Sequence, residues 1–234
     1  MKKILVCEDE DSIRDFVVIN LKRAGYDVSD VASGEEAVEE YQRQNGDFDV
    51  ALLDIMMPGM DGFALCKWIR EQSAAIGIIM LSAKSQEIDK VNCLMIGADD
   101  YVTKPFSPSE LVARVDAIYR RVSVSRPQKS ERTVITSGEY TLDLQNRLVT
   151  RNGKTVELTQ VEYHIFEYLF TNRDTALDRK SILQHIWGDT YIGEDKVIDV
   201  NIRRLRMKLE EDPSRPEHIQ TVWGFGYKWN SGDR

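Results

Sequence analysis

The sequence predicts two domains: an α/β domain built on a parallel sheet, then a domain with a small antiparallel sheet, three helices and a terminal hairpin. The first prediction depends on short apolar runs that alternate with amphipathic stretches of helical spacing, a pattern that favours strand–helix–strand units. The second depends on a change of pattern after residue 132, where apolar and polar residues alternate around the turn dipeptide Asn152-Gly153. A chain of 234 residues is long enough for two cores.

Charge also separates the two halves. Residues 1–121 carry 14 Lys and Arg against 22 Asp and Glu, whereas residues 122–234 carry 17 of each. The stretch 122–132 contains Pro127, is polar and has no helical or strand periodicity, so it is predicted to be a linker. We therefore expect domains at 1–121 and 133–234.

Composition disfavours several classes of protein. No apolar run reaches the roughly 18 residues of a membrane span, and carboxylates follow the N-terminus too soon for a signal peptide, so we expect a cytoplasmic protein with no membrane partner. Three scattered cysteines without a C-x-x-C pair disfavour a disulfide framework or a thiolate metal site.

Polar residues follow four of the predicted strands in the first half. Glu8 and Asp9 come after KILVC, Asp54 ends DVALLD, Ser82 ends GIIMLS, and Lys104 ends DYVTK. Because ligands of parallel α/β sheets bind beyond the carboxyl ends of the strands, these side chains are expected to converge at one edge of the sheet.

This set of residue types has a chemical logic. Crowded carboxylates repel one another, so the site is expected to hold a hard divalent cation, and Mg²⁺ suits one or two carboxylates, waters and a phosphoryl oxygen. Asp54 is then a candidate nucleophile toward phosphorus, with the metal and Lys104 neutralising the transferring group and Ser82 donating a hydrogen bond to it. The alternative is a group of strand-end residues that only face water, and the agreement of four strand ends disfavours it.

The motifs EDED at Glu8–Asp11, LLDIMMPGMDG at Leu52–Gly62, LSAK at Leu81–Lys84 and GADDYVTKPFSPSEL at Gly97–Leu111 resemble those of the receiver domain of bacterial two-component response regulators. The resemblance covers about residues 1–121 and implies a flavodoxin-like fold with a five-stranded parallel sheet. It implies that Asp54 accepts a phosphoryl group from a sensor histidine kinase, that Lys104 contacts the phosphate, and that Ser82 and Tyr101 act as switch residues. It also implies that Mg²⁺ is held by Asp9, Asp54 and the backbone carbonyl of Met56, with Glu8, which stands where many receivers have Asp, in the outer shell.

Helix signals organise the second half. Thr159 and Glu162 form a capping box ahead of VEYHIFEYLF, and Asp178 precedes RKSILQHIW. A third helix, DKVIDVNIRRLRMKLEE, places a stripe of apolar residues on the face that is expected to meet the core: Ile198, Ile202, Leu205 and Leu209.

The opposite face of the third helix gives the candidate DNA contacts. Basic residues on an outer helix face are usually solvated, and the neutral charge of this half gives no bulk argument for nucleic acid. Residues 196–208, however, contain five Lys and Arg against one Asp, and an outward Val200 favours contact with a thymine methyl. The candidates are the outward Lys196, Val200, Arg203 and Arg204, with Asn201 and Arg206 at the flanks.

The order of sheet, three helices and hairpin, with IDVNIRRLRMKLE at Ile198–Glu210 and VWGFGYKW at Val222–Trp229, resembles the winged-helix effector domain of the OmpR/PhoB class over about residues 133–230. It implies a transcriptional regulator rather than an enzyme, with the third helix in the major groove, the hairpin as the wing, and residues 188–194 facing RNA polymerase. Trp223 stands where one branch of the family has arginine, and we predict that it packs beneath the hairpin rather than entering the minor groove.

The last receiver helix predicts a dimer face. Its buried stripe is expected at Leu111, Val115 and Ile118. The resemblance implies that the phosphorylated form is a homodimer with cross-subunit ion pairs: Lys90 with Glu110, Asp100 with Arg114, and Asp99 with Arg121. The alternative is a solvated face with an intrahelical pair of Glu110 and Arg114.

Two other functional classes stay open at this point. An enzyme of the haloacid dehalogenase type also forms an aspartyl phosphate, but it needs a second Asp two residues after the nucleophile, where this chain has Met56. A receiver whose output domain binds protein rather than DNA is the second alternative.

Overall fold

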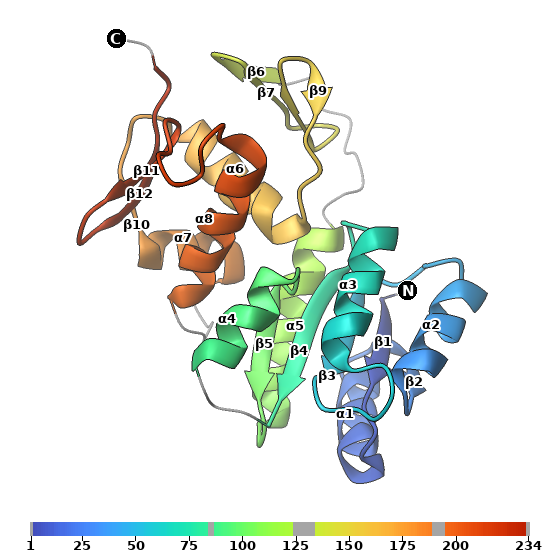
Figure 1. The fold of residues 1–234 in the computed structure, drawn as a ribbon. Coiled ribbons are helices and arrows are strands. Elements are labelled where there is room, and N and C mark those ends of the chain that lie inside the picture. Colours follow the sequence, from blue (N-terminus) through green and yellow to red (C-terminus); the bar gives the residue numbers. More distant parts are fainter. Residues whose placement is uncertain (1, 84–86, 124–133, 189–194, 233–234) are drawn as a thin grey trace. The chain divides into compact units, whose positions relative to one another are not determined.

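The computed structural model describes residues 2–83, 87–123, 134–188 and 195–232 (Figure 1). The chain divides into two compact units, Met1–Ser123 and Val124–Arg234, and each is described by itself. Among the helices in the described ranges, none combines the length and the apolar composition that crossing a bilayer requires.

Apolar runs of the first unit form a parallel sheet with the strand order β2-β1-β3-β4-β5. The strands are β1 (Lys3–Cys7), β2 (Asp27–Val31), β3 (Val50–Asp54), β4 (Gly77–Ser82) and β5 (Asp100–Thr103). Every residue of β3 and of β4 is buried, as expected for central strands that helices cover on both faces. The predicted five-stranded parallel sheet is confirmed.

Four helices connect these strands: α1 (Asp11–Arg23), α2 (Gly34–Arg43), α3 (Gly62–Gln72) and α4 (Glu87–Met95). A fifth helix, α5 (Pro108–Ser123), follows β5. α1 packs against α5, and α2 packs against α3, so the two pairs cover the sheet (Figure 1). The predicted buried stripe of α5 is confirmed, because Leu111, Val115 and Ile118 are at most 1% exposed.

The segment between β3 and α3 is held close to the end of β3. The carboxylate of Asp61 caps α3 by accepting a hydrogen bond from the backbone N–H of Ala64. The first residue of α3, Gly62, lies so close to β3 that a Cβ atom there would be 2.1 Å from the backbone oxygen of Asp54. The missing side chain of Gly62 therefore allows this segment to return to Asp54.

The second unit begins with an antiparallel sheet of β6 (Val134–Ser137), β7 (Tyr140–Asp143), β8 (Leu148–Arg151) and β9 (Lys154–Thr155). Three helices follow: α6 (Gln160–Thr171), α7 (Arg179–Trp187) and α8 (Lys196–Leu209). The predicted capping box of Thr159 and Glu162 is present at the start of α6. A second sheet has the order β10-β12-β11 and consists of β10 (Leu177–Asp178), β11 (Ile219–Val222) and β12 (Gly226–Trp229).

Aromatic side chains form the core of this second unit. Trp229 on β12 is fully buried, and its ring makes edge contacts with Tyr140 on β7 and with Phe166 and Phe170 on α6. These contacts join the antiparallel sheet, α6 and the terminal hairpin, and so they fix the base of that hairpin within its unit.

Candidate phosphorylation and DNA-binding sites

The carboxyl ends of β1 and β3 bring three carboxylates together. Oxygen atoms of Glu8, Asp9 and Asp54 all lie within 4.8 Å of one another. Asp9 is exposed, whereas Glu8 and Asp54 are buried, at 0% and 3% exposure. The predicted convergence of these side chains is therefore present in the structure.

Lys104, which follows β5, joins this cluster. Its Nζ lies 2.7 Å from Glu8 Oε2 and 3.0 Å from Asp54 Oδ1. The backbone N–H of Lys104 donates to the carbonyl of Ser82 at 2.7 Å, so the ends of β4 and β5 are tied together beside the carboxylates. Ser82 itself is 3% exposed.

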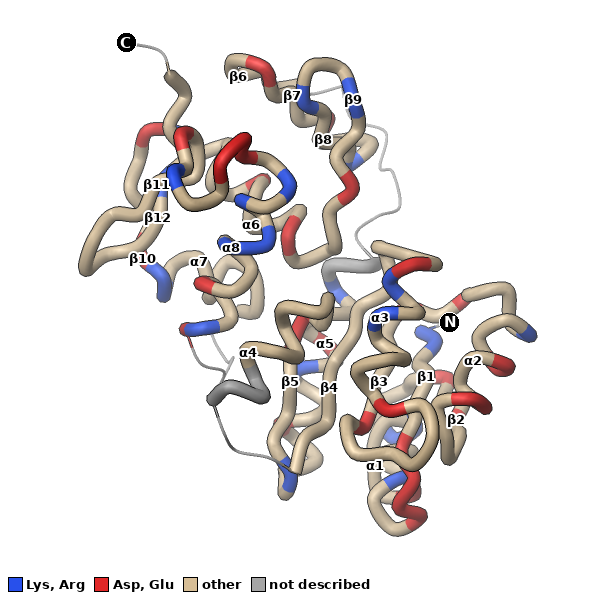
Figure 2. Tube along the Cα trace, viewed as in Figure 1, with Lys and Arg blue, Asp and Glu red and all other residues tan. Residues whose placement is uncertain are grey.

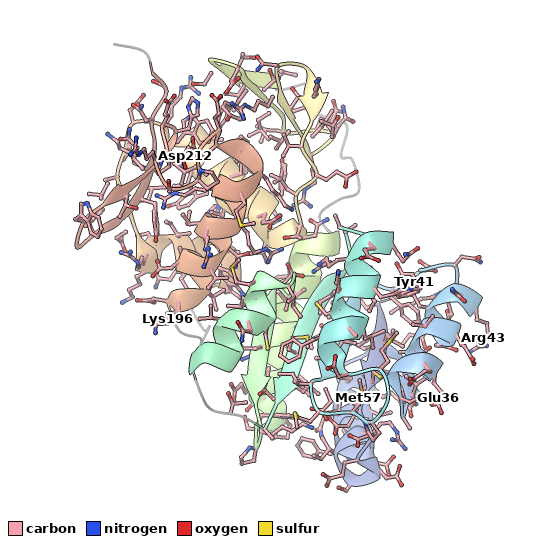
Figure 3. The ribbon with its side chains drawn as sticks, viewed as in Figure 1. Glu36, Tyr41, Arg43, Met57, Lys196 and Asp212 are labelled. Carbon is pink, nitrogen blue, oxygen red and sulfur yellow. The ribbon has the colours of Figure 1, made fainter. Side chains whose placement is uncertain are left out.

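Burial and charge perturb the acids of this site. Burial raises the pKa of Glu8, the bonded Lys104 opposes that rise, and the nearby Asp54 adds to it. Burial, with a smaller contribution from surrounding carboxylates, also raises the pKa of the Cys7 thiol to about 12. Cys7 lies directly before Glu8, and its sulfur lies 3.4 Å from the sulfur of Met57, a residue that follows β3. Figure 3 labels Met57. Cys7 is therefore a neutral packing residue behind the carboxylates.

The cluster opens into a pocket of about 850 Å³. Its polar lining includes the three carboxylates and Lys104, and its lining also includes Met56 and the small, exposed Ala83. Two buried oxygen atoms in it, Glu8 Oε2 and Asp54 Oδ1, accept no hydrogen bond from the described residues, although Lys104 lies within ion-pair distance of both. Buried carboxylate oxygens with spare acceptor capacity, facing an open pocket, fit a hard cation such as Mg²⁺.

The other predicted switch residue lies in the sheet. Tyr101 is 6% exposed on β5, where it pairs in register with Met80 of β4, two residues before Ser82. Both switch candidates therefore belong to the adjacent strands β4 and β5.

Two residues of the predicted dimer face have ionic partners within the chain. Asp99 has a fully buried side chain that pairs with Arg70 and accepts from the backbone N–H of Ile78. Asp100 is also buried, and its carboxylate pairs at 3.1 Å with Arg114 of the same chain. In the single chain these buried carboxylates therefore have partners within the chain, as buried charges require, and their predicted pairing with a second copy stays a prediction.

The remaining members of that face are less constrained. Glu110 forms the alternative intrahelical pair with Arg114 at 3.0 Å. The side chains of Lys90 and Arg121 lie outside the described residues, so their predicted pairing is not seen here.

In the second unit, α8 turns its predicted apolar stripe inward. Ile198, Ile202, Leu205 and Leu209 are at most 1% exposed, which confirms the stripe. The predicted outward positions of Val200 and Arg204 are wrong, because these residues are 7% and 6% exposed. Asn201 is fully buried, and its amide donates to the carbonyl of Val197 one turn earlier. The buried arc of α8 is therefore wider than the apolar stripe.

A buried carboxylate on α6 explains the position of Arg204. Glu162 is fully buried and lies 2.8 Å from Arg204 Nε and 2.6 Å from Lys208 Nζ. From the sequence, Glu162 was predicted only as a member of the capping box. Nothing in the sequence indicated that Arg204 and Lys208 of α8 would both pair with its carboxylate.

The outer face of α8 keeps fewer basic residues than predicted. Lys196, Arg203 and Lys208 are exposed, and Met207 is 59% exposed beside them. Figure 2 marks the basic positions along α8, and Figure 3 labels Lys196 at the start of the helix. Of the predicted DNA contacts, Lys196 and Arg203 are thus exposed.

Arg206 is half-buried and braces α8 against the terminal hairpin. Its guanidinium donates to the carbonyl of Ile219 at 2.7 and 3.0 Å and to the hydroxyl of Thr221 at 2.9 Å, both on β11. On the other hairpin strand, the hydroxyl of Tyr227 donates to Asp199 of α8 at 2.7 Å. The helix and the hairpin therefore form one braced unit.

The hairpin ends in an exposed aromatic turn. Trp223 is 91% exposed and Phe225 is 47% exposed. The prediction that Trp223 packs beneath the hairpin is wrong, because the last cross-strand pair is Val222 with Gly226 and the residues between them extend past the paired strands. Most of the segment predicted to face RNA polymerase, residues 189–194, lies outside the described residues.

Comparison with known proteins agrees with this geometry. Residues 4–116 match the response regulator receiver domain family, and residues 153–229 match the family of transcriptional regulatory proteins, C-terminal domain. The chain is a two-component response regulator. The sensory transduction protein RegX3 of Mycolicibacterium smegmatis is 40% identical over 228 residues, which cover 97% of this chain and 99% of RegX3, and RegX3 of Mycobacterium tuberculosis gives the same values.

Solved structures place this response regulator in the same class. DrrB of Thermotoga maritima, described as an OmpR/PhoB homolog, is 31% identical with a TM-score of 0.51, and a mutant of RitR is 27% identical with a TM-score of 0.73. Both comparisons cover 98% of this chain and 99% of the other. The predicted family and the predicted function as a transcriptional response regulator are confirmed, and the C-terminal match argues against both alternatives, a dehalogenase-type enzyme and a protein-binding output.

Proposed function

We propose that Asp54 is the phosphoacceptor of this response regulator. The observation that carries the proposal is the meeting of Glu8, Asp9, Asp54 and Lys104 at the carboxyl edge of the sheet. An oxygen of Asp54 attacks the phosphorus of a phosphohistidine in the cognate sensor kinase, an O–P bond forms, and the N–P bond breaks with both electrons going to the imidazole.

Other residues of the site have supporting roles. Asp9, Asp54 and the backbone carbonyl of Met56 would hold Mg²⁺, with Glu8 beside them, and the ion would neutralise charge on the transferring group. Lys104 contributes a second positive charge beside the nucleophile, since its ammonium already lies 3.0 Å from Asp54. Ser82 and Tyr101 are proposed to report the new phosphate to β4 and β5.

The output side of the proposal concerns promoter DNA. Residues 1–121 would act as the receiver, 122–132 as a linker and 133–234 as the effector, in the cytoplasm where promoter DNA lies. Lys196 and Arg203 contact DNA from the outer face of α8, whereas Arg204 and Arg206 position the helix through Glu162 and β11. Phosphorylation would promote dimerisation and contact with RNA polymerase.

The phosphoacceptor is tested by phosphorylating the full chain with acetyl phosphate in the presence of Mg²⁺. The wild type should gain one acid-labile phosphate, and Asp54→Asn should gain none because the amide lacks the nucleophilic oxygen pair. Asp11→Asn, an exposed carboxylate on α1, is the matched control and should be phosphorylated normally. Acid-labile phosphate on Asp54→Asn would show that another residue is the acceptor.

A further inference from the structure

The loop between β3 and α3, residues 55–61, carries the backbone carbonyl of Met56, a ligand in the Mg²⁺ site proposed above. Both ends of this loop are fixed at the end of β3. The N–H of Ile55 donates to the carbonyl of Leu81 on β4 at 3.0 Å, and the N–H of Gly62 returns to donate to the carbonyl of Ile55 at 3.2 Å. The direction of the Met56 carbonyl therefore depends on what holds the loop between these ends.

The first turn of α2 holds the tip of the loop. The N–H of Met60 donates to Oε1 of Glu35 at 2.9 Å. Gly34, the first residue of α2, is buried against the same loop, and a Cβ atom there would lie 2.4 Å from the backbone oxygen of Met60. Gly59 makes room for the carboxylate, since a Cβ atom there would lie 2.6 Å from Glu35 Oε1. The tip of the loop thus fits closely around one carboxylate.

The start of α2 is itself fixed to the sheet. The hydroxyl of Ser33 caps α2 by accepting a hydrogen bond from the N–H of Glu36 at 3.2 Å. The sulfur of Cys7, at the end of β1, lies 3.2 Å from the carbonyl of Ser33 and 3.4 Å from the sulfur of Met57. Figure 3 labels Glu36 on α2 and Met57 on the loop. Glu35 therefore belongs to a capped helix that packs on the end of β1 together with the loop.

Apolar packing alone leaves the loop without a fixed direction. Ile55 and Met57, on either side of Met56, are 4% and 6% exposed, so their burial holds the loop on the sheet. Burial of apolar surface is non-directional, whereas a hydrogen bond requires a particular geometry of donor and acceptor. Glu35 is exposed, so its carboxylate contributes little to the core and acts on the loop through its hydrogen bond.

We propose that Glu35 is a positioning residue for the Mg²⁺ site. By accepting from the N–H of Met60, its carboxylate keeps the loop in the conformation in which the Met56 carbonyl binds the ion together with Asp9 and Asp54. This inference rests on the proposed function and adds to it a residue that does not touch the ion. Groups that orient a metal ligand typically contribute about 10- to 100-fold to affinity, and one exposed hydrogen bond should lie at the lower end of that range.

The first test measures Mn²⁺ binding to the full, unphosphorylated chain, with free Mn²⁺ followed by electron paramagnetic resonance. Mn²⁺ suits the same carboxylate and carbonyl oxygens as Mg²⁺. Glu35→Ala should raise the Kd about tenfold. Glu35→Gln, whose side-chain oxygen still accepts from Met60, should stay within about twofold of the wild type. Glu39→Ala removes an exposed carboxylate one turn later on α2 and should bind normally.

The second test separates the hydrogen bond from general stability. Gly59→Ala places a methyl group where the Glu35 carboxylate lies, so it should also weaken Mn²⁺ binding. In the double variant Glu35→Ala/Gly59→Ala the total loss should be smaller than the product of the two single losses, because both changes act on the same hydrogen bond. Exchange of the Met60 amide hydrogen, measured by NMR, should be faster in Glu35→Ala than in Glu35→Gln or the wild type. Thermal unfolding of Glu35→Ala should stay close to that of the wild type, because the residue is exposed.

The inference would be overturned by an unchanged Kd in Glu35→Ala, by equal losses in Glu35→Gln and Glu35→Ala, or by losses that multiply fully in the double variant. It would also be overturned if the Met60 amide exchanged equally fast in Glu35→Ala and the wild type, because the hydrogen bond would then not hold the loop. A wild-type chain that binds no Mn²⁺, or Asp9→Asn that binds it as tightly as the wild type, would instead contradict the metal site of the proposed function, and the inference with it.

Discussion

The ammonium of Lys104 lies 3.0 Å from Oδ1 of Asp54 and so occupies the space beside the proposed nucleophile before any phosphate is present. The same ammonium lies 2.7 Å from Glu8 Oε2. A phosphoryl group on Asp54 would bring new anionic oxygens to this position, and Lys104 would exchange its carboxylate partners for them. Since Lys104 is bonded to Ser82 through its backbone, that exchange acts at the join of β4 and β5.

Replacing Lys104 should allow phosphorylation but prevent the dimerisation that follows it. We expect Lys104→Ala to accept phosphate on Asp54, because the nucleophile and the acidic ligands are intact, and to stay monomeric afterwards, because the cation that links the phosphate to β5 is lost. Phosphate content and light scattering measure the two properties on one sample. Arg120→Ala, on the receiver helix α5, is a control that should dimerise normally. A Lys104→Ala chain that dimerises as the wild type does would show that another residue transmits the signal.

Asp9 should determine the Mg²⁺ requirement. It is the exposed member of the acidic cluster, and its carboxylate lies with those of Glu8 and Asp54. Loss of one anionic ligand from a hard-cation site should raise the Mg²⁺ concentration for half-maximal phosphorylation by at least about tenfold in Asp9→Asn. Asp15→Asn, an exposed carboxylate on α1, should leave that concentration unchanged. Equal Mg²⁺ curves for the two variants would remove Asp9 from the metal site.

The pair of Asp100 and Arg114 should stabilise the receiver itself. Both side chains are at most 8% exposed and lie 3.1 Å apart within one chain. Removing one partner leaves a buried charge without its counter-ion, so Asp100→Asn should lower the free energy of unfolding of the first unit by about 3 to 5 kcal/mol. Glu110→Gln, which removes only the more exposed partner of Arg114, should cost less than about 1 kcal/mol. Calorimetric unfolding of the full chain resolves the two values, and equal losses would contradict the assignment.

The geometry of the proposed phosphorylation site was predictable because its residues lie at strand ends. Alternating strands and helices fix a parallel sheet, and the sheet brings Glu8, Asp54 and Lys104 to one edge whatever the details of packing. The position of Asp99 and Asp100 was not predictable in the same way. Sequence spacing places residues on an edge strand, but it does not show that Arg70 and Arg114 reach those carboxylates from neighbouring helices.

In the second unit, too, sequence spacing predicted the buried apolar residues but not the buried polar ones. Apolar spacing located the inward stripe of α8, since Ile198 and Leu205 need no particular partner to be buried. A polar side chain is buried only where it has a specific partner, and for Arg204 that partner is Glu162. Helical periodicity alone does not show such a partner, so it assigns the polar residue to the surface. For Trp223 the error has the opposite direction: the residue was predicted to be packed and is exposed. A large aromatic residue is usually buried, but this one extends from a turn.

Glu162 should be the main ionic support of α8. Burial by itself would raise the pKa of the Glu162 carboxyl, but Arg204 and Lys208 outweigh burial and hold it below the ordinary value of 4.5. At pH 7 the carboxylate is therefore ionised and paired, and Glu162→Gln should lower the stability of the second unit by about 3 to 5 kcal/mol. Glu167→Gln, also on α6 but with a partly exposed carboxylate beside His164, should cost less than about 1 kcal/mol.

The loss of stability expected for Glu162→Gln should depend on pH, because Arg204 and Lys208 lower the pKa of Glu162 in the folded chain. A carboxyl whose pKa is lower in the folded state contributes stability above its unfolded pKa, and that contribution is lost as the pH falls through the folded pKa, because the unfolded chain takes up the proton first. The difference in unfolding free energy between wild type and Glu162→Gln should thus be largest at neutral pH and shrink below pH 4.5. Denaturant unfolding at neutral and acidic pH, followed by the emission of the buried Trp187 and Trp229 in a background without Trp68 and Trp223, measures it. A difference that stays constant across this range would mean that the carboxylate supports α8 only through packing and the capping box, not through its charge.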